Sequence, residues 1–285
     1  MKEIIVAMIG YGGIARAHAK GYSTLADENY PVKLVAVCDV DEKRFESQMS
    51  INIETGQKGL PEDVHIYTDV EELIKNEEYD MVDICIPTYL HKEYAVRFME
   101  LGKDVLCEKP MALNSKDCEI MIETSKKTGR KLMIGQCLRF NPAYLYLKEC
   151  IDNNTFGQIR HISMHRLSAL PRWGFEHWFE DAEKSGGCIL DMHIHDVDMA
   201  RFLLGEPEAV SVCSIDNEMR WQYNNTRLFY KNALVTINGS WDEGDSFVFG
   251  VGFRARFEKA SVVLEGSILK VYPNEGEAFI PEVPA

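Results

Sequence analysis

The sequence predicts a two-domain α/β protein: residues 1–135 form a doubly wound parallel sheet, and residues 136–285 an α+β domain with a large, open, mostly antiparallel sheet. Three observations predict this fold class. Short apolar runs alternate with amphipathic stretches of helical period in the first half, as the strands and crossover helices of a parallel sheet do. A glycine-rich turn follows the first apolar run. After residue 136, several runs alternate apolar with polar residues, which is typical of antiparallel strands with one covered face.

Each element of the first domain has a local signal. The predicted strands are residues 4–9, 34–38, 65–67, 81–86, 105–107 and 132–134. The predicted helices are residues 14–25, a stretch that carries Leu73 and Ile74, and residues 91–101 and 115–127. Asp69 is a good N-cap for the second of these helices. Gly102 and Gly129 stand where a glycine commonly ends a helix.

The second domain is predicted to begin with a helix near Pro142, because proline is well tolerated in a first turn. The predicted strands follow at residues 159–167, 209–215, 227–230, 234–241, 247–257 and 261–264. One helix, residues 189–204, interrupts them and ends at Gly205.

Composition excludes several classes of partner. The 31 basic and 45 acidic side chains leave a formal charge of −14, and no basic stripe suits a nucleic acid. No run of about 20 apolar residues predicts a membrane span, and no targeting signal is recognised. The 8 cysteines form no Cys-x-x-Cys pair. They are therefore expected to be reduced thiols, and the protein to be cytoplasmic.

The turn after the first predicted strand matches the dinucleotide fingerprint G-x-G-x-x-(G/A). It consists of Gly10, Tyr11, Gly12, Gly13, Ile14 and Ala15. Gly10 permits the tight turn, Gly12 lets the backbone approach a pyrophosphate, and Ala15 lets the helix pack close to the strand. The helix N-terminus would supply N–H groups to the phosphates. The alternative is a glycine turn that binds no nucleotide.

Asp39 ends the second predicted strand, about where a ribose-binding acid is expected. Its carboxylate would accept hydrogen bonds from the ribose diol and repel a 2′-phosphate, so NAD is favoured over NADP. Lys43 and Arg44 lie one turn further on and would partly offset this preference. The alternative for Asp39 is a plain turn residue at the end of a strand.

Two further segments point to chemistry. Lys109 follows the fifth strand, at the edge of the sheet where ligands of open α/β proteins bind. Asp191 and His195 are four residues apart, so on one helix they share a face, where a carboxylate would orient an imidazole for proton transfer. A solvated lysine and an exposed helical ion pair are the alternatives. His193 lies two residues from His195 and points elsewhere on a helix, so no metal site is predicted.

The chain resembles the glucose–fructose oxidoreductase/inositol dehydrogenase family of NAD(P)-dependent oxidoreductases over nearly its whole length. The resemblance is carried by Gly10–Ala15, Asp39, Pro87-Thr88 with His91, Glu108-Lys109-Pro110, Arg139-Phe140 with Pro142, and Asp191 with His195. It implies a Rossmann domain followed by an α/β domain whose open sheet mediates assembly, and therefore a homodimer or homotetramer. Family members usually continue past the last strands, so this chain is C-terminally short in comparison.

The resemblance also implies roles for residues. Lys109 would hydrogen-bond the reacting hydroxyl or carbonyl, and His195 would exchange the proton, oriented by Asp191. The residues expected to line the cofactor pocket or its nicotinamide end are Pro87, Thr88, His91, Glu108, Gln136 and Arg139. The substrate is expected to contact the catalytic residues and also Arg139, Arg172 and Trp173. For the segment at Trp173, the alternative is packing in an aromatic core.

The predicted function is hydride transfer between NAD and a secondary alcohol or carbonyl of a sugar or polyol. Two alternatives stay open. One is a sugar-processing enzyme that oxidises its substrate transiently to permit elimination, as NAD-dependent glycosidases do. The other is an NAD-binding regulator without turnover, which would need the cofactor residues but not the proton path.

Overall fold

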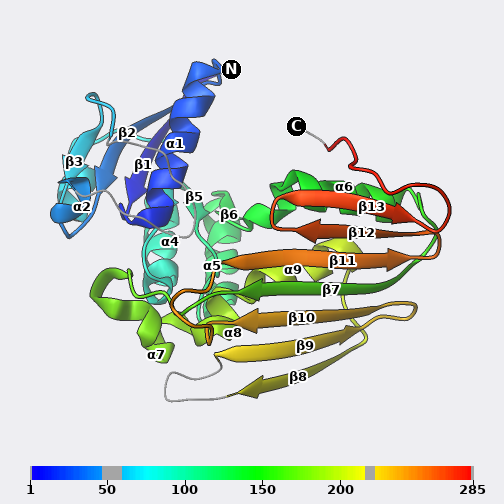
Figure 1. Ribbon diagram of the computed structural model, residues 1–285. Helices are drawn as coiled ribbons and strands as arrows, with labels where there is room; N and C mark the ends of the chain where they lie inside the picture. Colours follow the sequence, from blue (N-terminus) through cyan, green and yellow to red (C-terminus); the bar gives the residue numbers. More distant parts are fainter. Residues whose placement is uncertain (1, 47–59, 216–221, 284–285) are drawn as a thin grey trace. The chain divides into compact units, whose positions relative to one another are not determined.

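The computed structural model describes residues 2–46, 60–215 and 222–283 (Figure 1). They divide into two compact units. The first unit comprises the described residues up to Gly135 together with Trp173–Trp178. The second comprises Gln136–Arg172 and the described residues from Phe179 onward.

The first unit is built on a six-stranded parallel sheet in the order β3-β2-β1-β4-β5-β6. Its strands are β1 (Ile4–Ile9), β2 (Val32–Cys38), β3 (His65–Tyr67), β4 (Met81–Ile84), β5 (Asp104–Cys107) and β6 (Leu132–Ile134). The strand order reverses direction at β1, and β4 starts the second half of the sheet. In such sheets, ligands bind beyond the carboxyl ends of the strands at this switch point, which here lies between β1 and β4.

The crossover helices cover the apolar strands of this sheet. They are α1 (Gly13–Asp27), α2 (Lys43–Glu46), α3 (Val70–Asn76), α4 (His91–Glu100) and α5 (Ser115–Thr128), with a 3₁₀ turn η1 (Thr88–Leu90) before α4. Asp69 caps α3 by accepting the Glu71 N–H, as its residue type predicts. Fully buried side chains such as Leu73 and Phe98 join helices and strands in one of the two apolar clusters of this unit. Each such side chain stabilises the fold by about 1.5–3 kcal/mol.

The second unit is built on a seven-stranded sheet in the order β13-β12-β11-β7-β10-β9-β8. Its strands are β7 (Ile159–Leu167), β8 (Ala209–Ile215), β9 (Tyr223–Phe229), β10 (Leu234–Ser240), β11 (Gly250–Phe257), β12 (Ala260–Glu265) and β13 (Ile268–Pro273). Only the β7–β10 pair is parallel among these described strands; the other pairs are antiparallel. The predicted fold class is therefore confirmed for both sheets.

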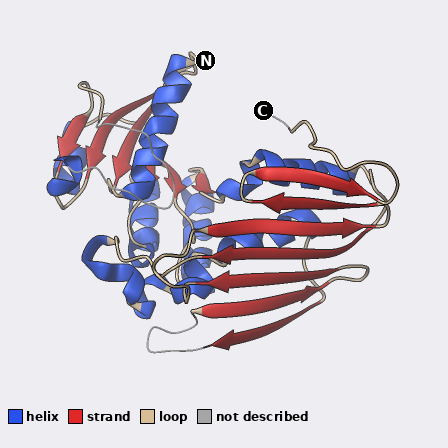
Figure 2. Ribbon diagram, viewed as in Figure 1, coloured by secondary structure: helices blue, strands red, loops and turns tan. Residues whose placement is uncertain are grey.

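Helices cover one face of the second sheet (Figure 2). They include α6 (Pro142–Asp152) and α9 (Ile194–Leu204). The shorter turns of this unit are η2 (Cys137–Phe140), α7 (Ala182–Ser185) and α8 (Gly187–Asp191), whereas η3 (Phe175–Glu180) begins in the first unit and ends in the second. Along β7, Ile162 and Met164 are fully buried against the helices, while their neighbours in the strand are half-buried. This period of two matches the alternation that predicted the strand.

The prediction of one continuous helix over residues 189–204 is wrong. Residues 189–204 form α8 and α9, separated by Met192 and His193, instead of one continuous helix. The His193 N–H bonds to the Cys188 carbonyl, five residues back, and the Asp196 N–H bonds to the His193 carbonyl, three residues back. A wide turn followed by a tight one changes the helical register, which a sequence period does not reveal.

Candidate functional site

The turn after β1 has the geometry of an anion site. Gly10 adopts φ +89°, and a side chain there would collide with the backbone carbonyl of Cys85. Gly12 caps α1, and a Cβ on Gly12 would meet no described atom within 4 Å. The start of α1 has no side-chain cap and no acidic residue in its first turn. Its N–H groups therefore fit a diphosphate, which supports a dinucleotide over a bare glycine turn.

Asp39 ties this turn to the end of β2. One carboxylate oxygen accepts the Tyr11 N–H at 2.6 Å, and the other accepts the Asp41 N–H at 2.9 Å. Arg44 lies in α2, where its Nε is 3.3 Å from Asp41. The structure thus places two of the three residues predicted to set cofactor preference beside the fingerprint: Asp39 accepts the Tyr11 N–H, and the Arg44 carbonyl accepts a hydrogen bond from Arg16 of α1 at 2.5 Å.

Glu108 and Lys109 follow β5 directly. The buried Glu108 carboxylate accepts the Lys109 N–H at 3.1 Å, and the Lys109–Pro110 peptide bond is cis. Gly135 lies against this carboxylate, because a Cβ there would be 2.6 Å from Glu108 Oε1. The backbone of Lys109 is therefore held by a side chain that has little room to move.

His91 is fully enclosed between the loops after β4 and β5. Its Nε2 lies 2.9 Å from the Ile86 carbonyl oxygen and its Nδ1 lies 2.8 Å from the Pro110 carbonyl oxygen. Burial lowers the pKa of His91. Its ring joins the two loops, with Pro87 and the buried Thr88 at the start of η1 beside them. The assignment of these residues to the cofactor stays a prediction.

In the second unit, Asp191 ends α8 and is buried, and His195 stands in the first turn of α9 and is half-buried. They belong to adjoining helices because of the irregular turn described above. His193, between them, is 1% exposed and lies 2.8 Å from Thr226 Oγ1. Burial lowers the pKa of His193.

The predicted substrate arginines make ion pairs within the protein. Arg139 holds Asp198 through two hydrogen bonds of 2.8 and 2.6 Å. Arg172 lies 3.1 Å from Asp245 on an exposed surface. Gln136 is half-buried at the start of η2. The roles of these three residues toward a ligand stay predictions.

Sequence reasoning missed a cluster of buried polar side chains in the first unit. Its members are His18, Tyr22, Asp83, Cys85 and Glu108, of which only Glu108 was expected to be functional. One atom each of His18, Asp83 and Cys85 that could coordinate a metal ion (a ring nitrogen, a carboxylate oxygen and the sulfur) lies within 4.8 Å of the other two. One signal was available: Asp83 is an acid inside an otherwise apolar strand, and such a residue needs a buried partner.

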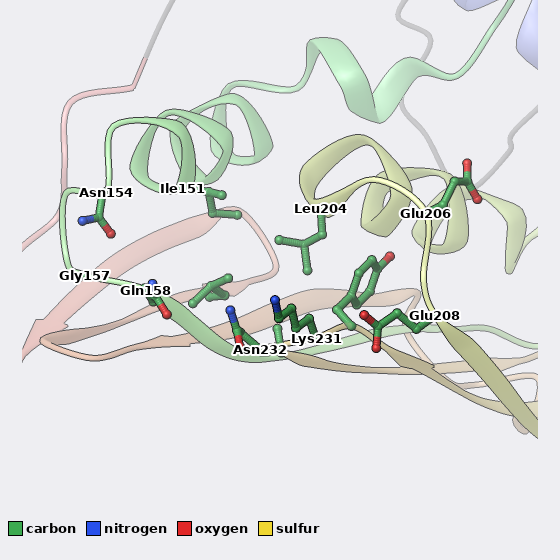
Figure 3. Close-up of a pocket in the computed structure, with 12 residues that line it drawn as sticks. Ile151, Asn154, Gly157, Gln158, Leu204, Glu206, Glu208, Lys231 and Asn232 are labelled. Atoms are coloured by element: carbon green, nitrogen blue, oxygen red, sulfur yellow. The ribbon is translucent and has the colours of Figure 1, made fainter.

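A cavity of about 420 Å³ in the second unit lies elsewhere (Figure 3). It is formed by the ends of α6 and α9 and by the hairpin between β9 and β10, including Ile151, Leu204 and Lys231. Leu204 is the last residue of α9, whereas His195 is in its first turn. No predicted site residue lines this cavity.

Two family profiles together match most of the chain. The profile described as "Oxidoreductase family, NAD-binding Rossmann fold" matches residues 4–136, and the "GFO/IDH/MocA C-terminal domain" matches residues 144–263. Myo-inositol 2-dehydrogenase of Thermotoga maritima is 34% identical over 202 residues, which are 70% of this chain and 55% of that protein. Glucose-6-phosphate 3-dehydrogenase of Bacillus subtilis is 36% identical over 211 residues, 71% of this chain and 54% of that protein. The chain thus spans about half the length of these curated relatives.

Solved structures share the fold. The WlbA dehydrogenase of Bordetella pertussis, in complex with NADH and UDP-GlcNAcA, superposes with a TM-score of 0.80 at 20% identity, covering 97% of this chain and 79% of that one. A levoglucosan dehydrogenase in complex with NADH has a TM-score of 0.80 at 19% identity, covering 98% and 80%. Among the described residues, the structure contains no helix long and apolar enough to cross a membrane.

Proposed function

The chain belongs to the GFO/IDH/MocA oxidoreductase family, and from this premise we propose that it transfers a hydride between NAD and a secondary alcohol or carbonyl of a sugar or polyol. The observation that carries the proposal is the uncapped start of α1, where Gly12 leaves room for a diphosphate. The curated relatives act on inositol and on glucose 6-phosphate according to their names, and this supports the substrate class.

The first unit would hold the cofactor. The N–H groups at the start of α1 would bind the pyrophosphate, and Asp39 would accept hydrogen bonds from the adenosine ribose. NAD is favoured over NADP because a carboxylate at this position repels a 2′-phosphate. Arg44 is engaged by Asp41, which reduces its ability to offset that repulsion. Pro87, Thr88, His91, Glu108 and Gln136 would complete the pocket.

Bound NAD supplies the hydride acceptor or donor, and the chain supplies orientation and a proton path. Lys109 donates a hydrogen bond to the reacting oxygen and positions it. His195 takes the proton from the hydroxyl during oxidation and returns it during reduction. Asp191 orients His195 and stabilises its protonated form. Arg139, Arg172 and Trp173 contact the substrate.

The proposal extends to setting and assembly. Cys38, Cys85 and Cys107 are buried free thiols, which supports a reducing, cytoplasmic setting. The seven-stranded sheet offers a broad face for pairing with a second copy, which supports a homodimer or homotetramer.

The test is a panel of polyols and keto-sugars, with nicotinamide absorbance followed in the presence of NAD or NADP. Turnover with a panel member is expected, and the KM for NAD should be lower than the KM for NADP. Lys109→Ala and His195→Ala are expected to keep NAD binding and lose about 100-fold or more in kcat. Lys126→Ala, at an exposed lysine of α5, is the control and should keep full activity.

Three results would contradict the proposal. Near-normal kcat in both catalytic variants would refute the assigned roles. Tight NAD binding with no turnover on any member of the panel would favour a regulator. Retained NAD that is reduced and reoxidised within one turnover, without NADH in solution, would favour transient oxidation.

A further inference from the structure

A buried ionic bridge links the helix that begins at the fingerprint turn to the loop that carries Lys109. His18 lies on α1, Asp83 lies within β4, and Glu108 directly follows β5. The His18 side chain is 19% exposed, the Asp83 side chain 0% and the Glu108 side chain 10%. All three groups belong to the first unit.

The contacts of the imidazole define its protonation state. His18 Nδ1 lies 2.9 Å from Asp83 Oδ2, and His18 Nε2 lies 3.1 Å from Glu108 Oε1. A carboxylate only accepts hydrogen bonds, so both ring nitrogens must donate to satisfy both contacts. The ring that fits this site is the imidazolium. Asp83 is further fixed by the Tyr22 hydroxyl, which donates to Asp83 Oδ2 at 2.9 Å.

Electrostatics agree with this geometry. Burial by itself would lower the pKa of His18, but the side-chain hydrogen bonds to Asp83 and Glu108 act in the opposite direction, and the pKa of His18 is raised. Burial also raises the pKa of the Cys85 thiol, and Asp83 adds to this effect. The cluster therefore holds a cation between two anions, with a protonated thiol beside it.

The bridge continues to Lys109 through the second oxygen of Glu108. Oε1 faces His18, while Oε2 accepts the Lys109 N–H at 3.1 Å. Gly135 also lies against Oε1, because a Cβ on Gly135 would be 2.6 Å from this oxygen. His18 thus holds one oxygen of the Glu108 carboxylate, and the other oxygen in turn holds the Lys109 backbone.

We propose that His18 is a positioning residue: a permanently protonated imidazole that fixes Glu108, and through Glu108 the backbone of Lys109, relative to α1. The proposal rests on the proposed function in assigning Lys109 to catalysis. His18 itself touches no reacting atom. Its loss should therefore loosen the lysine loop and lower kcat while α1 still binds the dinucleotide.

The first test uses the unmodified protein. Among the eight histidines, His18 is expected to keep both ring nitrogens protonated at pH 8.5 in ¹⁵N-detected NMR, where an ordinary histidine is neutral. Its ring signals are assigned by through-bond correlation to the His18 backbone, because the ring nitrogens of His91 also face two acceptor oxygens. If both ring nitrogens are not protonated at this pH, the proposal is overturned. One equivalent of tightly bound zinc that is lost in Cys85→Ala would also overturn it, because His18 would then be a metal ligand.

The second test compares His18→Gln with His65→Gln, which removes a histidine–carboxylate pair from the surface. In His18→Gln the Lys109 amide should exchange its hydrogen at least about tenfold faster. With the substrate found by the panel, kcat should fall at least about tenfold, while KM and the Kd for NAD change by less than about threefold. His65→Gln should change none of these quantities.

The outcomes separate this proposal from the proposed function. Unchanged Lys109 amide exchange in a folded His18→Gln variant refutes the bridge even if the enzyme turns over sugars. Faster exchange supports the bridge even if no substrate is found. Should His18→Gln fail to fold, the protonation state in the unmodified protein still decides.

Discussion

Replacing His18 by glutamine should change how stability depends on pH. The ordinary histidine pKa is 6.5, and the folded protein raises it. Below pH 6.5 both the folded and the unfolded chain bind the proton, so the bridge contributes its full stabilisation. Above pH 6.5 only the unfolded chain releases the proton, so this stabilisation falls by about 1.4 kcal/mol per pH unit. Between pH 7 and pH 9 the loss amounts to about 2.5 kcal/mol.

The assay is urea unfolding of the wild-type protein and of His18→Gln at several pH values from 6 to 9. The difference between their free energies of unfolding should be largest at pH 6 and should shrink steadily above pH 7. His65→Gln, which removes an exposed histidine, should show no comparable trend because solvent screens its ion pair. A difference that stays constant with pH, or grows toward pH 9, would show that His18 is neutral in the folded protein.

Four further substitutions have defined outcomes, one of them also combined with a second change. Gly12→Ala should cost only about 0.5–1 kcal/mol of stability but weaken NAD binding at least about tenfold. Gly10→Ala should unfold the first unit, because Gly10 has a positive φ and a Cβ there would collide with the Cys85 backbone. Thermal melts with and without NAD check both substitutions. Arg166→Met should cost about 3–5 kcal/mol because it leaves the buried Asp196 without its cation, and adding Asp196→Leu should recover most of that loss in the same melts. His193→Gln should remove a decline in stability below pH 6.5, where the unfolded chain takes up a proton that the buried, neutral His193 does not; urea titrations at pH 5 and pH 7 measure it, and an unchanged slope would contradict a lowered pKa.

The first sheet could be predicted because its signals are local. Continuous apolar runs predicted its strands, and glycines or caps predicted where helices begin or end. In the second sheet, β9 begins at Tyr223, whereas the predicted strand began at residue 227. The prediction missed these residues because Asn224 and Thr226 are polar and yet lie buried on the covered face. β13 was not predicted, since Lys270 and Tyr272 alternate with only two buried residues, Leu269 and Val271.

The site could be predicted only where its parts are contiguous in sequence. The turn at Gly10 and the Glu108-Lys109 pair are short motifs with a physical rationale. His18 meets Asp83 and Glu108 across 65 and 90 residues, and no local period reports such a meeting. The interrupted helix before His195 depends on one hydrogen bond that spans five residues, and the amino-acid types there do not specify it.

The middle of the second sheet can form only after the strands that follow β7 in the chain have been synthesised. β7 pairs with β10 and β11, so His161 lies beside Leu234 on one side and Arg256 on the other. A ribosome therefore releases β7 long before either neighbour exists. Until then its backbone N–H and carbonyl groups are open to any strand nearby, including the same segment of another nascent chain. Growth temperature and chaperone supply should consequently govern the soluble yield of this protein more than the final stability of its folded state does.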